Sequence, residues 1–99
     1  MVTIIVKDHA PNCLSNNDGQ IIQELVLPFL KDKQPVEVSF KGIHSATTSF
    51  INSAFVELLD HFDFENIKAF LKITNSNNHI NGLIKRRFET TLSSMAMRA

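Results

Sequence analysis

Short runs of β-branched residues alternate along this chain with segments whose apolar residues recur every three to four positions. The first pattern is typical of β-strands and the second of amphipathic helices. The order is strand, helix, strand, helix, strand, helix, without an internal repeat. Strands that alternate with helices pair in parallel through right-handed crossovers. The sequence therefore predicts a small β-α-β-α-β-α domain of the α/β class with a mostly parallel sheet.

Three segments have the strand pattern. Val2–Val6 is a nearly continuous apolar run, which is typical of a strand covered on both faces. The second strand follows Pro35, because apolar and polar residues alternate over 36–40. The third is predicted over Ile67–Ile73, after a turn at Asp63–Asn66. A sheet of three strands leaves at least one edge that is exposed, extended by a further strand or paired with another chain.

Three segments have the helical pattern. The first begins at Asn17 or Asp18 and stops by about Lys33, and we expect Pro28 to kink or shorten it because proline removes a backbone donor. The second has the clearest apolar stripe, from Phe50 to Phe62. The third follows an Asn-rich loop, and its predicted buried residues are Ile80, Leu83, Ile84, Phe88, Leu92 and, near its end, Met95.

Length and charge narrow the class of protein. With 99 residues, the chain predicts a single domain over residues 1–99, with a core over about 2–94 and a frayed tail at 95–99. Ten Lys and Arg residues balance ten Asp and Glu residues, so a nucleic-acid partner is not expected.

The single cysteine, Cys13, excludes an internal disulfide and fits a reducing compartment. No apolar run approaches the roughly 18–20 residues that span a bilayer, and the first seven residues do not resemble a signal peptide. We therefore expect a soluble cytoplasmic protein without a membrane partner.

Catalytic motifs are absent from the sequence. In or just after the loops that follow the three predicted strands are His9, His44 and His79. They could form a zinc tripod, but they have no HxH or HExxH spacing. Cys13 could act as a nucleophile beside a histidine, although no local signature surrounds it. We therefore predict no enzyme, no cofactor and no metal, and keep a metal- or cysteine-dependent enzyme as a third hypothesis.

The segment between the second strand and the second helix is rich in hydroxyl groups. Ser45, Thr47, Thr48 and Ser49 precede the apolar stripe that begins at Phe50. One interpretation is structural: a hydroxyl there caps the helix. The other is functional, because a phosphoryl group near a helix N-terminus is tolerated and adds nearly two negative charges to the surface. Such a modification would act as a switch at a partner interface, and we leave both interpretations open.

Lys85, Arg86 and Arg87 form the one basic cluster in the chain. Three cations on one helix can contact phosphates or the acidic face of a protein. They can equally form a solvated helix face with favourable charge toward its C-terminal half. Because the net charge is zero, we favour the solvated face and keep the cluster as a secondary candidate site.

The strand, loop and helix in VEVSFKGIHSATTSFINSAFVELL, followed by IKAFLKITNSNNHINGLIKRRFE, resemble the STAS-like domain family of unknown function. The resemblance covers about residues 14–92. Its most specific stretch is the hydrophobic strand followed by Thr47-Thr48-Ser49-Phe50, which opens an amphipathic helix. The family is related, by its name and β-α organisation, to the STAS domains of anti-sigma factor antagonists.

This resemblance implies a protein-interaction module without enzymatic activity. In the anti-sigma factor antagonists, a kinase that is also the binding partner phosphorylates a serine at the start of this helix. Lining up the strands places Thr48 at that serine, with Ser49 beside it. Thr47 stands where those proteins have an acidic residue, and Phe50 stands where they have a glycine. The initial strands of a full STAS domain are reduced here to Val2–Val6.

Two functions follow as hypotheses. The first is a regulatory module that binds a protein, such as a kinase-like ATPase or another regulator, through Ile43–Ile51; its candidate residues are Thr47, Thr48, Ser49, His44 and Ser45. The second is a small phage or mobile-element inhibitor that binds a host protein through its sheet edge and basic cluster and forms a homodimer through a sheet edge. Both predict a cytoplasmic protein of bacterial or phage origin.

Overall fold

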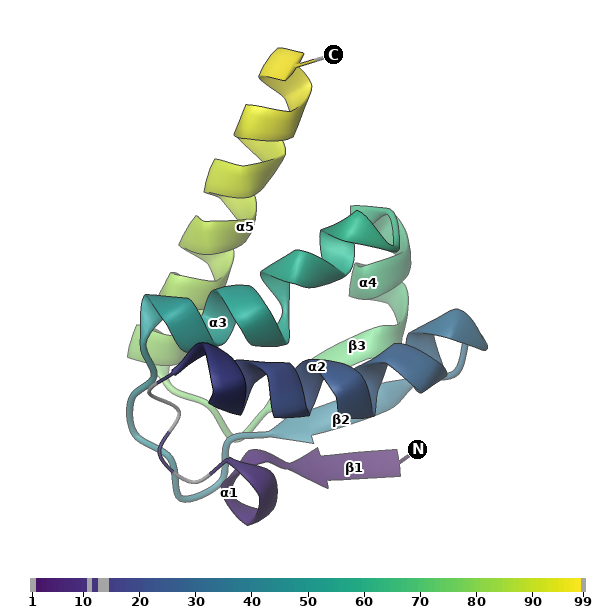
Figure 1. The fold of residues 1–99 in the computed structure, drawn as a ribbon. Helices are drawn as coiled ribbons and strands as arrows, with labels where there is room; N and C mark the ends of the chain where they lie inside the picture. Colours follow the sequence, from purple (N-terminus) through teal and green to yellow (C-terminus); the bar gives the residue numbers. More distant parts are fainter. Residues whose placement is uncertain (1, 11, 13–14, 99) are drawn as a thin grey trace.

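The computed structural model describes residues 2–10, 12 and 15–98. Three strands form one parallel sheet in the order β1-β2-β3, and helices connect them (Figure 1). The α/β class, the parallel sheet and the alternation of strands with helices are confirmed. In chain order the elements are β1 (Val2–Ile5), α1 (Val6–His9), α2 (Asn16–Lys31), β2 (Val36–Ser39), α3 (Thr48–Ala54), the 3-10 helix η1 (Val56–Asp60), α4 (Phe64–Phe70), β3 (Leu71–Thr74) and α5 (Asn78–Arg98).

The sheet places apolar residues on one face and, apart from Ile5, polar residues on the other. Val38 of the central strand pairs with Ile4 of β1 and Ile73 of β3, and this row lies on the core face. One residue earlier, Glu37 pairs with Thr3 and Lys72 on the opposite face. The prediction that Val2–Val6 is covered on both faces is wrong, because β1 is an edge strand in which only Ile4 is buried.

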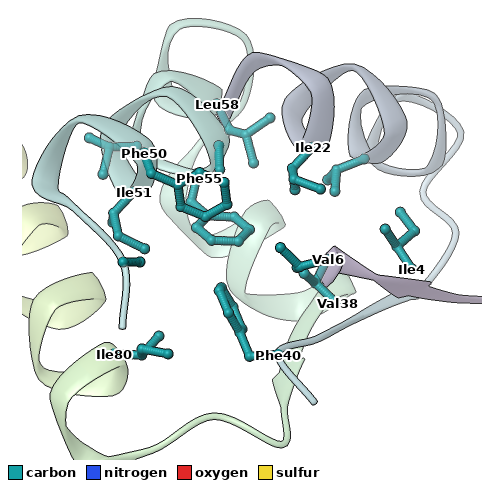
Figure 2. Packing of buried hydrophobic residues seen from close by; sticks show 14 of the residues in the cluster. Ile4, Val6, Ile22, Val38, Phe40, Phe50, Ile51, Phe55, Leu58 and Ile80 are labelled. Carbon is teal, nitrogen blue, oxygen red and sulfur yellow. The ribbon is translucent and has the colours of Figure 1, made fainter. Parts of the chain in front are cut away.

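The core lies between the sheet and the pair α2 and α3, which run side by side across the sheet (Figure 1). Phe40, just after β2, rises from the sheet toward the rings of Phe50 and Phe55 (Figure 2). Its ring centroid lies 6.4 Å from that of Phe50 and 6.1 Å from that of Phe55. All three phenylalanines are fully buried, so aromatic packing joins the sheet to α3.

Helix α2 begins earlier than the sequence indicated. Ser15, rather than Asn17 or Asp18, caps it, and its hydroxyl oxygen accepts a hydrogen bond from the backbone N–H of Asp18 at 3.2 Å. The helix ends at Lys31, in agreement with the predicted end by about Lys33, and Pro28 lies inside it rather than ending it. The pyrrolidine ring of Pro28 is exposed, and the buried Val26 and Leu30 on either side hold this turn against the core.

The stripe from Phe50 to Phe62 forms two elements instead of one helix. Helix α3 ends at Ala54, Phe55 adopts φ −127°, and η1 follows as a 3-10 helix. Phe55 is fully buried against Phe40, and Leu58 just beyond it is also fully buried. A 3.6-residue pattern does not distinguish an α-helix from a 3-10 turn that buries the same apolar residues.

The predicted third strand is half helix. Residues 64–70 form α4, and β3 begins only at Leu71, without a loop between them. Phe64 and Ile67 lie one helical turn apart, and the Phe64 ring packs against Phe88 of α5 with a centroid distance of 5.3 Å. The predicted turn at Asp63–Asn66 is therefore the beginning of α4, with Asp63 at its N-cap.

Helix α5 is the longest element and runs to Arg98. Ile80 in its first turn is fully buried, whereas its C-terminal half extends beyond the rest of the fold (Figure 1). None of the helices in the described part of the chain is long and apolar enough to cross a membrane.

Candidate functional site

The carboxyl ends of the parallel strands bring the loops after β2 and β3 together. The side-chain amide of Asn77 donates to the backbone oxygen of His44 at 2.8 Å, and the amide of Asn75 donates to the hydroxyl of Ser39 at 2.9 Å. Asn75 reaches that position with φ 53°, a left-handed conformation that asparagine tolerates better than most residues. These two hydrogen bonds hold loop 41–47 against the Asn-rich loop. Both loops lie at the carboxyl ends of the strands, where α/β proteins bind their ligands.

Loop 41–47 begins with a backbone turn that requires glycine. Gly42 has φ 80°, and the side chain of Lys7 from α1 lies beside it. Ile43 and Ala46 are buried and anchor the loop. Between these anchors His44 and Ser45 are exposed, so the structure places both predicted residues on the surface.

The hydroxyl groups at the start of α3 fall into two kinds. The hydroxyl oxygen of Thr47 accepts a hydrogen bond from the backbone N–H of Phe50 at 3.1 Å, which makes Thr47 the helix cap. Thr48 and Ser49 occupy the first turn and are exposed. Phe50 and Ile51, which follow directly, are fully buried, so this turn is held firmly while its two hydroxyls face solvent.

The three loop histidines do not form a metal centre in the described part of the chain. His9, His44 and His79 are all exposed. Among residues 2–10, 12 and 15–98, no three His, Cys, Asp or Glu side chains come together at a distance suited to one metal ion. Cys13, the candidate nucleophile, lies outside the described residues.

The basic cluster separates into different environments. The Nε of Arg87 donates to the side-chain oxygen of Asn52 on α3 at 3.1 Å, so this arginine ties α5 to α3. Lys85 and Arg86 are exposed, and Lys85 lies at the edge of an apolar pocket. The three cations therefore do not form one continuous surface.

A buried polar contact between α2 and α3 was not predicted from the sequence. The side-chain amide of Gln23 donates to the backbone oxygen of Ser53 at 2.8 Å, and the hydroxyl of Ser53 donates to Asn16 at 3.2 Å. Gly19, one turn before Gln23, permits this approach, because a Cβ there would lie 2.5 Å from the backbone oxygen of Phe50. The sequence signal for this contact is the four-residue spacing of Gly19 and Gln23, which places both on one face of the helix.

An apolar pocket of about 400 Å³ between α4, β3 and α5 was also not predicted. Its floor includes Leu71 and Ile73, the core-face residues of β3, which are only half-buried. Lys68 and Lys85 lie at its rim. The pocket could not be predicted because α4 forms one of its walls, and the sequence predicted a strand over Ile67–Ile73 instead of this helix.

Comparison with known proteins identifies a family. The model of the STAS-like domain of unknown function matches residues 18–81, which is more than half of the chain. Searches of curated proteins and of solved structures found no match. The matched region runs from the first turn of α2 to the first turn of α5 and contains β2, β3 and the whole of loop 41–47. The chain belongs to the family of STAS-like domains of unknown function.

Proposed function

We propose that this protein is a non-enzymatic regulatory module that binds a protein partner through the segment from Ile43 to Ile51. The observation that carries the proposal is the arrangement of Thr48 and Ser49, whose exposed side chains lie directly before two fully buried residues. A binding surface of this kind is already held in one conformation. Binding of a partner therefore costs little conformational entropy for ordering this segment.

His44 and Ser45 extend the same surface. Both are exposed, and the hydrogen bond from Asn77 to His44 holds their backbone in place. The proposed interface is therefore built from residues 43–47 of this loop and the first turn of α3. Thr47 contributes through the cap that it provides, since its hydroxyl oxygen accepts the N–H of Phe50.

Phosphorylation of Thr48 or Ser49 would regulate this surface. Their exposed hydroxyls are accessible to a kinase, and a phosphoryl group would add nearly two negative charges at the start of a helix, where negative charge is favoured. A kinase-like ATPase that is also the binding partner fits this arrangement, as does another cytoplasmic regulator. The same loop precedes α3 in the region that matches the STAS-like family.

Affinity capture from the native host, followed by mass spectrometry, tests this proposal. The expected result is one specific protein partner together with phosphate on Thr48 or Ser49 in a fraction of the molecules. Capture repeated with Thr48→Glu and Ser49→Glu should recover less of that partner, and Thr90→Glu on α5 serves as the matched control because Thr90 is also an exposed threonine. Equal recovery by all variants rejects this surface.

A second candidate function is a small inhibitor of a host protein, encoded by a phage or another mobile element, that dimerises by its sheet edge. The exposed strand β1 favours it, since Val2 is 49% exposed and Ile5 is 38% exposed on an edge where no other strand of the described residues pairs with β1. Ile5→Lys would disfavour pairing of two such edges. Sedimentation of that variant and of the wild type tests the candidate, and identical behaviour excludes edge pairing.

A further inference from the structure

The apolar pocket between α4, β3 and α5 lies where the helical cover of the sheet's core face is incomplete. On β2, Val36 and Val38 are fully buried beneath the helices, whereas Leu71 and Ile73 on β3 are only half-buried. Parallel sheets usually have their apolar faces covered by helices. The space above β3 therefore corresponds to a place where one more helix would pack.

The length and lining of this pocket fit a helix. Along α5 it extends from Asn81 to Leu92, which is about 16 Å at 1.5 Å per residue. Its opposite wall is formed by Phe64, Ile67 and Lys68 of α4. A pocket of this length and of about 400 Å³ accepts the apolar side chains along about three turns of an amphipathic helix, whose backbone would lie over it.

A helix with a matching apolar stripe is present in the same chain. The C-terminal half of α5 extends beyond the rest of the fold (Figure 1), with Leu92 half-buried and Met95 43% exposed. Leu92 also lines the pocket, so the stripe is continuous with the pocket surface. Two copies placed antiparallel along α5 would each fill the pocket of the other.

The charges beside the stripe are self-complementary in that arrangement. Lys85 and Glu89 lie on the same side of α5 and both line the pocket. Within the described residues neither forms an ion pair in the single chain. In an antiparallel pair of helices related by a two-fold axis, Lys85 of each copy faces Glu89 of the other, and both contacts are made by the same patch.

We infer that this chain forms a two-fold symmetric dimer in which the α5 helices pack antiparallel, with Lys85 of each facing Glu89 of the other, so that the middle of each α5 lies along the pocket between α4, β3 and α5 of its partner. Zero net charge imposes no overall repulsion between two copies. This surface is separate from the loop 41–47 surface and from the β1 edge, so the inference does not depend on the proposed function.

Sedimentation velocity of the full chain, from low micromolar to submillimolar concentration, tests the inference. The wild type is expected to sediment as a dimer, and Leu92→Glu as a monomer with unchanged helix content by circular dichroism. Thr90→Glu is the matched control, because Thr90 is exposed and lies on the side of α5 away from the pocket. It is expected to remain dimeric, as is Ile5→Lys at the β1 edge.

A charge exchange tests the register. Lys85→Glu and Glu89→Lys should each raise the dimer dissociation constant about tenfold, since each places like charges opposite one another. The double variant Lys85→Glu/Glu89→Lys should restore the wild-type constant. A monomeric wild type, a dimer that survives Leu92→Glu, or a double variant as weak as the single variants would each overturn the inference.

Discussion

The side chain of Asn77 makes two structural contacts, one with Ile80 at the start of α5 and one with His44 in the loop after β2. Its side-chain oxygen accepts the backbone N–H of Ile80 at 2.9 Å and so caps α5, while its side-chain nitrogen donates to the backbone oxygen of His44 at 2.8 Å. One amide therefore holds the start of α5 and the middle of the loop that carries the proposed interface. The position of that loop depends on the loop after β3 as well as on its own residues.

Asn77→Asp separates these two roles. The carboxylate still accepts the N–H of Ile80, but it cannot donate to His44 and instead faces that carbonyl oxygen. We expect faster amide hydrogen exchange over residues 43–46 and little change at the start of α5. Asn77→Ala should lose both contacts, costing about 1 kcal/mol for the cap alone. Asn78→Ala is the control, and equal exchange in Asn77→Asp and wild type would contradict the contact.

Gly19 and Gly82 give a matched pair for the packing of α2 on α3. Gly19→Ala should destabilise the protein by about 2 kcal/mol, because the added Cβ would lie 2.5 Å from the backbone oxygen of Phe50. Gly82 lies within α5 with open space around the position of a Cβ, so Gly82→Ala should stabilise by about 0.5–1 kcal/mol. Urea denaturation of both variants measures the difference, and a harmless Gly19→Ala would refute the close approach of the two helices.

Thr47 and Thr48 are adjacent but should respond differently to truncation. Thr47→Ala removes the cap of α3 and should cost about 1 kcal/mol of stability. Thr48→Ala removes an exposed side chain and should change stability by less than about 0.5 kcal/mol. Thermal unfolding distinguishes them. Comparable losses in both variants would mean that Thr48 also has a structural role.

Gln23 provides a test of the buried polar contact. Gln23→Leu removes the donor to the backbone oxygen of Ser53 in a buried environment and should destabilise the protein by about 1–2 kcal/mol. Gln20→Leu, at an exposed position on the same helix, is the control and should be close to neutral. If Gln23→Leu is as stable as wild type, burial of the leucine offsets the lost hydrogen bond.

Much of the fold could be predicted because the relevant signals are local. The alternation around Val36 and Val38 identified the central strand, and the hydroxyl-rich segment located the start of α3. Distant contacts decided the remaining elements. Phe64 begins a helix where a turn was predicted, and Ile67 continues this helix where an apolar run suggested a strand. The ring of Phe64 packs on Phe88, twenty-four positions later in the chain.

The candidate site could be predicted as a segment but not residue by residue. Ser45, Thr47, Thr48 and Ser49 are equivalent in composition, and only the structure assigns the cap to Thr47 and exposes the other three. The contact from Asn77 to His44 joins loops separated by 33 positions, and no local pattern encodes such a bond. The pocket and the contact between Gln23 and Ser53 likewise arise only when helices meet.

The most direct test of the proposed function is a calorimetric titration of the captured partner with the folded protein and its Thr48→Glu and Ser49→Glu variants. We expect each variant to bind the partner at least about tenfold more weakly than wild type, a loss of about 1.4 kcal/mol, while Thr90→Glu binds as wild type does. If both variants retain wild-type affinity and a native circular dichroism spectrum, the segment from Ile43 to Ile51 is not the partner-binding surface.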